Sequence, residues 1–187
     1  MQPTRYTKAD RNTYFTCSAE ELAPWLLGKI LCVRINNANE PDNVVRVRIF
    51  ETEAYGKNDS ACYGRKFDGR QTVIRKTPAN RFLFREAGFC CIYGGMLLIT
   101  AGNTESPENV LVRGAGNEEA YCSGPVLLCE YLKIGKDFNG VDILSSQDIW
   151  LEDDSAQREI FQTLRKSKTI RLPHQIFHAI LTLPCPT

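Results

Sequence analysis

The stretch Val47–Tyr63 constrains the fold of this chain more than any other, because it begins as a strand and ends in a polar loop. It places Glu51, Glu53 and Tyr55 two positions apart, and residues two apart in an extended chain point to the same face. The strand gives way to a loop at Gly56. Carboxylates and an aromatic ring on one face at a strand end indicate a functional site. An edge strand with a solvated acidic face is the alternative that this stretch alone leaves open.

The segments before this strand predict a helix and a hairpin. Ser18 followed by Glu21 is a capping-box pattern, and the helix that it opens stops at Gly28. Lys29–Ile35 and Val44–Tyr55 are two strand candidates, joined by a turn rich in Asn, Asp and Pro. We therefore expect a helix, a strand, a long turn and a second strand in this order.

The remainder of the chain predicts further strands and a second helix. An apolar run over residues 89–101 is interrupted by Gly94–Gly95, a short strand covers Val110–Arg113, and Ser123-Gly-Pro125 opens a helix that ends at Gly135. Residues 141–151 suggest another strand, residues 152–154 an acidic turn, residues 155–166 a helix, and the tail one or two strands. We expect one α+β domain over residues 14–187, preceded by a polar N-terminal arm over residues 1–13.

Composition is that of an ordinary globular protein. The chain has 187 residues and a net charge of +1, which neither favours nor excludes a polyanionic partner. It has no apolar run of about 18 residues and its polar start is not a secretory signal, so we expect an intracellular protein of a reducing compartment that does not bind membranes. We interpret the eight cysteines, none in a C-x-x-C pair, as reduced and buried small hydrophobes.

Residues 65–85 concentrate positive charge. Seven Lys and Arg residues stand against a single acid, which gives the segment a net charge of 7 − 1 = +6. Such a segment can follow a phosphate backbone, and its candidate contacts are Arg70, Arg75, Lys76 and Arg81. A solvated charged loop is the alternative. Met96 directly follows the Gly94–Gly95 turn, where an apolar side chain can wedge into a minor groove, although Met96 read alone is a core residue.

The two histidines, His174 and His178, are spaced so that both would lie on one face of a helix, where such pairs can bind zinc. The metalloprotease pattern needs a glutamate after the first histidine, and Gln175 stands there. No cysteine pair with zinc-finger spacing supplies further ligands. We therefore expect no metal site.

Five motifs together resemble the alkyladenine (3-methyladenine) DNA glycosylase family. They match in order and approximate spacing over roughly residues 14–152, and they are Leu22–Lys29, Glu51–Tyr55, Asp59–Ala61, Gly69–Thr72 and Cys122–Cys129. Glu-Thr-Glu-Ala-Tyr combined with the later Cys-Ser-Gly-Pro is specific, whereas either alone is weak. The resemblance implies a single compact α+β domain, with a curved antiparallel sheet flanked by helices. It also implies a monomer without cofactors that removes alkylated or deaminated purines flipped out of double-stranded DNA.

The same resemblance suggests roles for individual positions. Glu53 is similar to the general base that activates water, and Arg113 to an arginine beside the water site. Tyr55 and Tyr93 resemble aromatic residues that stack on the flipped base. Asn103 resembles the asparagine that crowds out the amino group of guanine.

The chain also departs from the family pattern. The loop after Tyr55 is one residue short, and Tyr63, or Cys62 if the gap moves, stands where the family has a histidine. The intercalating residue is Met96 in the ungapped register and Tyr93 when a gap is allowed. The final 35 residues align poorly.

The residues suit a particular chemistry. Glycosidic cleavage needs a carboxylate that directs a water molecule at the sugar, which fits Glu53, while Arg113 would favour its ionised form or serve as a structural ion pair. Glu51 is expected to make a structural hydrogen bond, and Tyr63 keeps a ring for stacking. We predict a monofunctional DNA glycosylase that leaves an abasic site without cutting the strand. A non-catalytic binder of damaged DNA or nucleic acid on the same fold, and a small metalloprotein, remain as alternatives.

Overall fold

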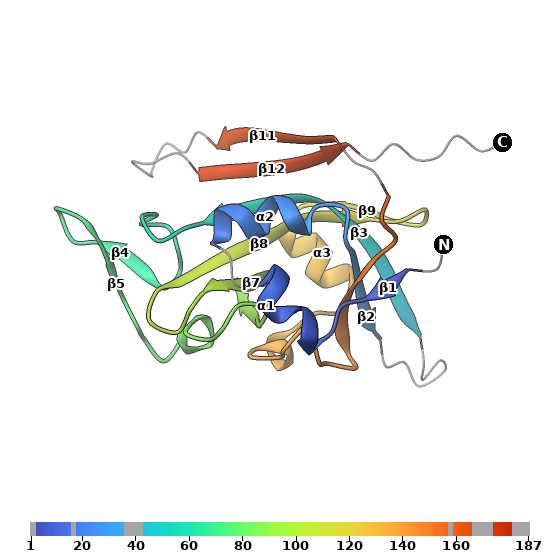
Figure 1. Cartoon of the computed structure of the whole chain (residues 1–187), viewed down its shortest axis with the longest axis horizontal. Helices are drawn as coiled ribbons and strands as arrows, with labels where there is room; N and C mark the ends of the chain where they lie inside the picture. Colours follow the sequence, from blue (N-terminus) through green and yellow to red (C-terminus); the bar gives the residue numbers. More distant parts are fainter. Residues whose placement is uncertain (1–2, 16–17, 36–42, 157–158, 166–173, 181–187) are drawn as a thin grey trace.

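The structure, a computed structural model, describes residues 3–15, 18–35, 43–156, 159–165 and 174–180 (Figure 1). Its helices are α1 (Arg11–Tyr14), α2 (Ala19–Leu26) and α3 (Pro125–Tyr131), and single 3₁₀ turns cover Lys8–Asp10, Arg81–Leu83 and Lys136–Phe138. Its first strands are β1 (Thr4–Arg5), β2 (Ile30–Arg34), β3 (Val44–Tyr55), β4 (Arg65–Phe67), β5 (Thr72–Ile74) and β6 (Cys90–Tyr93). The later strands are β7 (Met96–Gly102), β8 (Pro107–Gly116), β9 (Tyr121–Ser123), β10 (Ile149–Asp153), β11 (Glu159–Arg165) and β12 (His174–Ile180).

Ten of these strands form one curled antiparallel sheet. Its main order is β1-β10-β2-β3-β8-β7-β6, and β4 and β5 form a separate two-stranded hairpin. β9 pairs with the part of β8 beyond β7, and β12 pairs with the part of β3 beyond β2, while β11 pairs with β12. The expected single α+β domain with a curved antiparallel sheet is confirmed.

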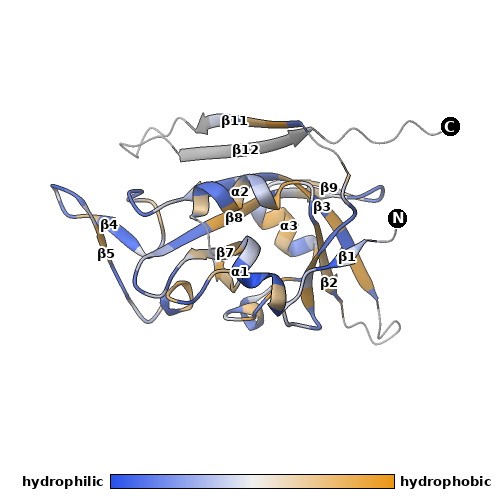
Figure 2. Ribbon diagram, viewed as in Figure 1, coloured by the Kyte–Doolittle hydropathy of each residue, from blue (hydrophilic) through white to orange (hydrophobic). Residues whose placement is uncertain are grey.

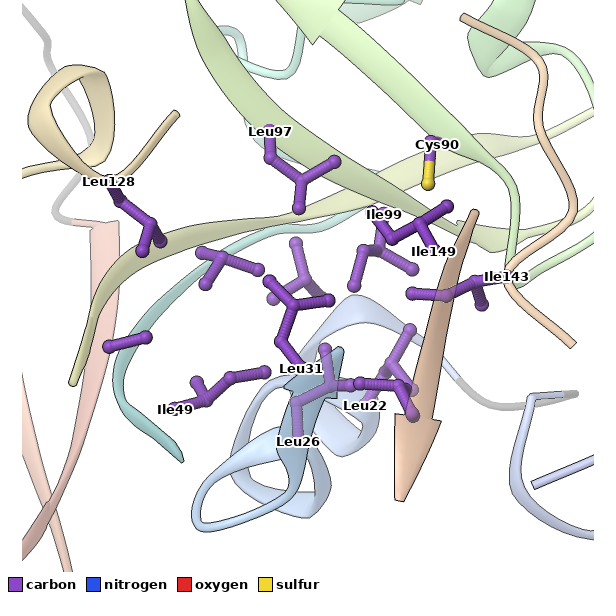
Figure 3. Close-up of a cluster of buried hydrophobic side chains, with 14 of the residues drawn as sticks. Leu22, Leu26, Leu31, Ile49, Cys90, Leu97, Ile99, Leu128, Ile143 and Ile149 are labelled. Atoms are coloured by element: carbon purple, nitrogen blue, oxygen red, sulfur yellow. The ribbon is translucent and has the colours of Figure 1, made fainter. Parts of the chain in front are cut away.

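The main core lies between one face of the sheet and helices α2 and α3. Figure 3 shows Leu22 and Leu26 of α2 and Leu128 of α3 directed at Leu31, Ile49 and other strand residues, all nearly or completely buried. Figure 2 shows α3 largely in the hydrophobic colours, whereas β4 is hydrophilic. The opposite face of β3, β8, β7 and β6 carries a second set of side chains that does not belong to this core.

Local signals explain the first part of the fold. Ser18 and Glu21 form the capping box that the sequence predicts. The helix α2 ends at Leu26, and Leu27 adopts an extended backbone conformation. The hydroxyl of Thr52 on β3 donates to the carbonyl of Ala23, which ties α2 to the sheet. The β2–β3 hairpin also follows the expectation, with Ile30 paired to Arg48.

The polar N-terminal segment is docked on the domain. β1 pairs with β10, and the hydroxyl of Tyr6 donates to Asp153 at 3.0 Å. Arg11 of α1 forms an ion pair with Asp142 at 2.6 Å. From residue 3 to residue 15, this segment therefore has defined contacts with the rest of the chain.

Three expectations about the C-terminal third are wrong. Residues 159–165 form β11 rather than a helix, because they pair with β12, which in turn pairs with β3. The acidic residues 152–154 do not form a turn, since Glu152 and Asp153 belong to β10 and make ion pairs with basic side chains. The strand expected over residues 141–151 is much shorter at its start, because β10 begins only at Ile149.

The histidine pair lies on a strand rather than on a helix. β12 starts at His174, and a strand separates the Cα atoms of residues four apart by about 13 Å, so the helical zinc-binding spacing does not apply. Within the described residues, no group of three or more His, Cys, Asp or Glu residues could hold a metal ion.

The cysteines of the described chain are free and buried, namely Cys32, Cys62, Cys90, Cys91, Cys122 and Cys129. Burial raises the pKa of the Cys62 thiol to about 11 and that of the Cys91 thiol to about 12, so both stay protonated and unreactive at neutral pH. Cys17 and Cys185 fall outside the described residues.

No helix in the described part of the chain has the length and hydrophobicity that a membrane span requires.

Candidate active site

Two carboxylates and one guanidinium meet where β3 runs beside β8. Arg113 Nη1 donates to Glu53 Oε2 at 2.7 Å, and Arg113 Nε donates to Glu51 Oε1 at 3.2 Å. The register of the ladder shifts on both sides of Glu51, and Arg113 falls between two paired residues of β8. Such bulges redirect a side chain, and here the guanidinium is directed at both acids.

This acidic pair is shielded from solvent. The side chain of Glu53 is 0% exposed, and those of Glu51 and Arg113 are 14% and 21% exposed. Burial by itself would lower the pKa of Arg113, but the hydrogen bonds and charges of Glu53 and Glu51 outweigh it and raise that pKa above its ordinary value. The expectation that Glu51 and Glu53 share one face is confirmed. Glu51 accepts the expected hydrogen bond, and its purely structural role stays a prediction.

The predicted aromatic residues lie on the same side of the sheet. Leu111, the ladder partner of Glu53, belongs to a small buried cluster against which Tyr55 and Tyr63 pack. The rings of Tyr63 and Tyr93 stack on one another with centroids 3.9 Å apart and planes inclined by 28°. Burial raises the pKa of Tyr63, so its hydroxyl is protonated at neutral pH. Tyr55, Tyr63 and Tyr93 therefore lie close together, with two of their rings in direct contact.

A tight hairpin carries Tyr93 and Met96. β6 and β7 pair Tyr93 with Met96, which leaves Gly94 and Gly95 as a two-residue turn. Their φ angles of +57° and +78° lie in the left-handed region that glycine adopts most readily, as this type of hairpin turn requires. Met96 is half-buried and packs against the same cluster as Tyr55 and Tyr63.

The candidate phosphate contacts lie on the β4–β5 hairpin and in the segment that follows it, and we call this set the basic strip. All four side chains are exposed, and the strip consists of Arg70, Arg75, Lys76 and Arg81. Arg75 directly follows β5, and its backbone N–H donates to the carbonyl of Gly64 at 2.8 Å. The hairpin β4–β5 projects from the body of the molecule (Figure 1).

Asn103 is separate from the acidic pair. It lies in the β7–β8 turn, at the opposite end of β7 from the glycine tip, and its Oδ1 accepts the backbone N–H groups of Glu105 and Ser106 at 2.9 and 2.7 Å. There it lines a cavity of about 430 Å³ together with Arg11 and Phe15. Its suggested role beside a bound base stays a prediction.

Two buried asparagines of this region were not singled out from the sequence. Asn80 is 2% exposed, and its Nδ2 donates to the carbonyls of Tyr63 at 2.9 Å and Arg75 at 2.7 Å. Asn109 is 1% exposed, is the ladder partner of Tyr55, and its Nδ2 donates to a cysteine sulfur at 3.1 Å. The Asn-Arg dipeptide at residues 80–81 carries no local signal of this bridging role.

Comparison with known proteins finds several that are named as 3-methyladenine DNA glycosylases. A protein of Psychrobacter cryohalolentis, provisionally named 3-methyladenine DNA glycosylase, is 28% identical over 158 residues, which is 71% of each chain. One of Trichodesmium erythraeum with the same provisional name is 31% identical over 82% of this chain and 85% of its own length. The human DNA-3-methyladenine glycosylase is 30% identical over 74% of this chain and 52% of its own length.

The family model described as methylpurine-DNA glycosylase (MPG) matches residues 13–167. This range contains the acidic pair, Arg113, all three tyrosines of the site and the basic strip. The chain belongs to the methylpurine-DNA glycosylase family.

Proposed function

We propose that this DNA-repair glycosylase flips a damaged purine nucleotide out of double-stranded DNA and hydrolyses its N-glycosidic bond with a water molecule that Glu53 activates. The observation that carries the proposal is the 2.7 Å hydrogen bond from Arg113 to Glu53, a carboxylate with 0% exposure. A buried carboxylate held in one orientation by a neighbouring cation suits the role of a general base. Glu51 holds the other side of the guanidinium and so fixes its direction.

The reaction follows from this geometry. The oxygen of the water molecule forms a bond to C1′ of the sugar while the bond between C1′ and the purine nitrogen breaks. The electron pair of that bond leaves with the base, and the carboxylate of Glu53 takes the proton of the water. The products are the free base and an abasic site, and no step requires a lysine nucleophile or strand cleavage.

The aromatic residues would hold the flipped base. A base between Tyr63 and Tyr93 needs ring centroids roughly 7 Å apart, about twice a single stacking distance, so the two rings must separate from their 3.9 Å contact. Tyr55, which packs against the same cluster, would then face the base together with Glu53. We infer that the contacting rings represent the resting state and that base binding opens them.

The partner in this proposal is duplex DNA, and the protein acts on it as a monomer inside the cell. The described residues of one chain include every proposed catalytic and stacking side chain, so no second copy is needed to complete the site. The exposed cations of the basic strip would contact phosphates, and Asn80 bridges Arg75 to Tyr63. Arg75→Ala should weaken DNA binding and reduce the slope of log K against log salt by about 1.

The test uses duplexes with one hypoxanthine, one ethenoadenine or one 7-methylguanine, incubated with excess enzyme and then treated with alkali. The wild type should produce an alkali-labile site, and Glu53→Gln should lose this product by about 100-fold or more while binding the lesion. Glu51→Gln is the matched control, because its amide oxygen can still accept the Arg113 hydrogen bond, and it should keep most of the excision. Bound lesion without product from the wild type would establish the non-catalytic binder instead, and full activity of Glu53→Gln would remove Glu53 from its role.

A further inference from the structure

Asn109 of β8 is a buried polar residue on the face of the sheet that carries the candidate active site. Along β8, Val110 and Val112 belong to the main core, whereas Leu111 belongs to the small cluster beside the site tyrosines and Arg113 reaches the acidic pair. Because side chains alternate between the two faces of a strand, Asn109 shares the face of Leu111 and Arg113. Asn109 is only 1% exposed, so its amide is removed from solvent on the side of the site.

The amide of Asn109 has more hydrogen-bonding capacity than its surroundings use. An asparagine side chain offers two N–H donors and an oxygen that can accept two hydrogen bonds. Nδ2 donates to Cys62 Sγ at 3.1 Å, and sulfur is a weak acceptor. Within the parts of the chain that the structure describes, no group donates to Oδ1 of Asn109. A buried polar atom without a partner costs stability, so its presence here requires an explanation.

Two other asparagines of this region differ from Asn109 in this respect. Oδ1 of Asn80 accepts the backbone N–H of Thr77 at 2.7 Å, while its Nδ2 donates to two backbone carbonyls. Oδ1 of Asn103 accepts two backbone N–H groups of the β7–β8 turn. Both amides therefore hold local backbone structure. A structural role accounts for Asn80 and Asn103 but leaves Oδ1 of Asn109 unexplained.

The position of Asn109 fits the far edge of a purine that reacts at Glu53. Asn109 is the ladder partner of Tyr55, and Leu111, two residues further along β8, is the ladder partner of Glu53. Glu53 and Asn109 are thus diagonal neighbours on one face, and such neighbours lie about 7–8 Å apart. This separation is comparable to that between C1′ of a purine nucleoside and the substituent on C6. A purine stacked on Tyr55, with its sugar at Glu53, would therefore present its C6 edge to the amide.

We propose that Asn109 is a specificity-determining residue whose amide hydrogen-bonds the C6 edge of the flipped purine. This inference rests on the proposed base flipping, and it assigns the group that reads the base. The separation of Tyr63 from Tyr93 would uncover the amide, because Asn109 is bonded to Cys62, the residue before Tyr63. By rotation, an amide presents either its oxygen to the amino group of an adenine derivative or its N–H groups to the oxygen of hypoxanthine. One side chain thereby accommodates both alkylated adenines and deaminated purines.

The test compares two lesions that differ at this edge. Hypoxanthine offers an oxygen and an N–H group to an amide, whereas ethenoadenine offers only nitrogen acceptors. The duplexes carry 2′-fluoro nucleotides of these bases, because fluorine withdraws electrons from the sugar and slows glycosidic cleavage, and fluorescence anisotropy measures their affinities beside an undamaged duplex. Asn109→Leu, a change of similar size, should weaken binding of the hypoxanthine duplex relative to the ethenoadenine duplex about five-fold, as expected for one buried hydrogen bond.

Further variants separate a contact with the base from a structural role. Val110→Ala, at the next residue of β8 with its side chain in the main core, is the matched control and should lose stability while keeping the ratio of the two affinities. Asn109→Leu should not lower the Tm, because it removes a poorly paired buried amide. Asn109→Ser fits where leucine does not, is too short to reach the base, and should shift the ratio in the same direction.

The proposal is overturned if both Asn109 variants weaken the two duplexes equally or leave the ratio of affinities as in the wild type. It is also overturned if Val110→Ala shifts this ratio as much as they do. Because the fluorinated duplexes are not cleaved during the measurement, the ratio is independent of the chemistry at Glu53. A shifted ratio without excision of the unfluorinated lesions would refute the proposed chemistry, whereas excision with an unchanged ratio would refute only the role of Asn109.

Discussion

Removal of Arg113 should reveal how strongly the acidic pair depends on a single cation. The guanidinium lies 2.7 Å from Glu53 and 3.2 Å from Glu51, and with all three groups ionised the cluster carries −2 + 1 = −1. Arg113→Ala would leave both carboxylates without this partner in surroundings from which solvent is largely excluded. Loss of one partner from a buried ion pair costs about 3–5 kcal/mol. For a domain of this size each kcal/mol shifts the Tm by about 2–4 °C, so we expect a decrease of roughly 6–20 °C.

The assay is thermal unfolding followed by circular dichroism at pH 8 and at pH 5. Protonation of a carboxylate removes a buried negative charge that has lost the guanidinium, so the folded variant should bind more protons than the unfolded chain and lose less stability as the pH falls. The difference in Tm from the wild type should therefore be smaller at pH 5. The double variant Arg113→Met, Glu53→Gln removes the charge at Glu53 but still leaves Glu51 without the guanidinium, so it should recover only part of the lost stability. A Tm within about 2 °C of the wild type at pH 8, or an equal loss at both pH values, would refute the reasoning.

Two further predictions concern residues outside the acidic pair. Burial alone would raise the pKa of Asp153, but the Lys29 ammonium at 2.6 Å and neighbouring donors hold that pKa well below its usual 3.8. The ionised Asp153 therefore stabilises the fold fully above pH 3.8, and this contribution is lost as the pH falls further. In urea unfolding, Asp153→Asn should therefore cost more stability at pH 6 than at pH 3, and an equal cost at both values would contradict this assignment. Asn80→Ala should cost about 1–3 kcal/mol, because the carbonyls of Tyr63 and Arg75 lose their buried donor. It should also weaken DNA binding measured by anisotropy, and unchanged stability and binding would show that solvent replaces the amide.

The sequence predicts those elements whose signals are local. The capping box at Ser18 fixes the start of α2 without reference to the rest of the chain, and the β2–β3 hairpin needs only the alternation of its two strands. The common face of Glu51 and Glu53 follows from their spacing. Roles at these positions came from resemblance to a family, and they stay predictions until the variants are measured.

The remaining features depend on long-range pairing that no sequence window contains. β11 carries a helix-prone sequence but lies in the sheet because β12 pairs with both β11 and β3. The bulge that directs Arg113 arises from the register between β3 and β8, some 60 residues apart. The contact between Tyr63 and Tyr93 requires both a loop and a hairpin to be positioned first.

In the proposed mechanism, the Tyr63–Tyr93 contact would also compete with every base that enters between the two rings. Base entry exchanges one contact between two tyrosines, worth about 0.5–1.5 kcal/mol, for two contacts between tyrosine and base. A small pyrimidine overlaps each ring poorly and barely repays the exchange. A purine with a positive charge from alkylation gains a cation–π term at each ring, about 0.5–1 kcal/mol or more when desolvated. If base flipping occurs as proposed, the resting contact would therefore favour electron-poor purines before any bond is broken.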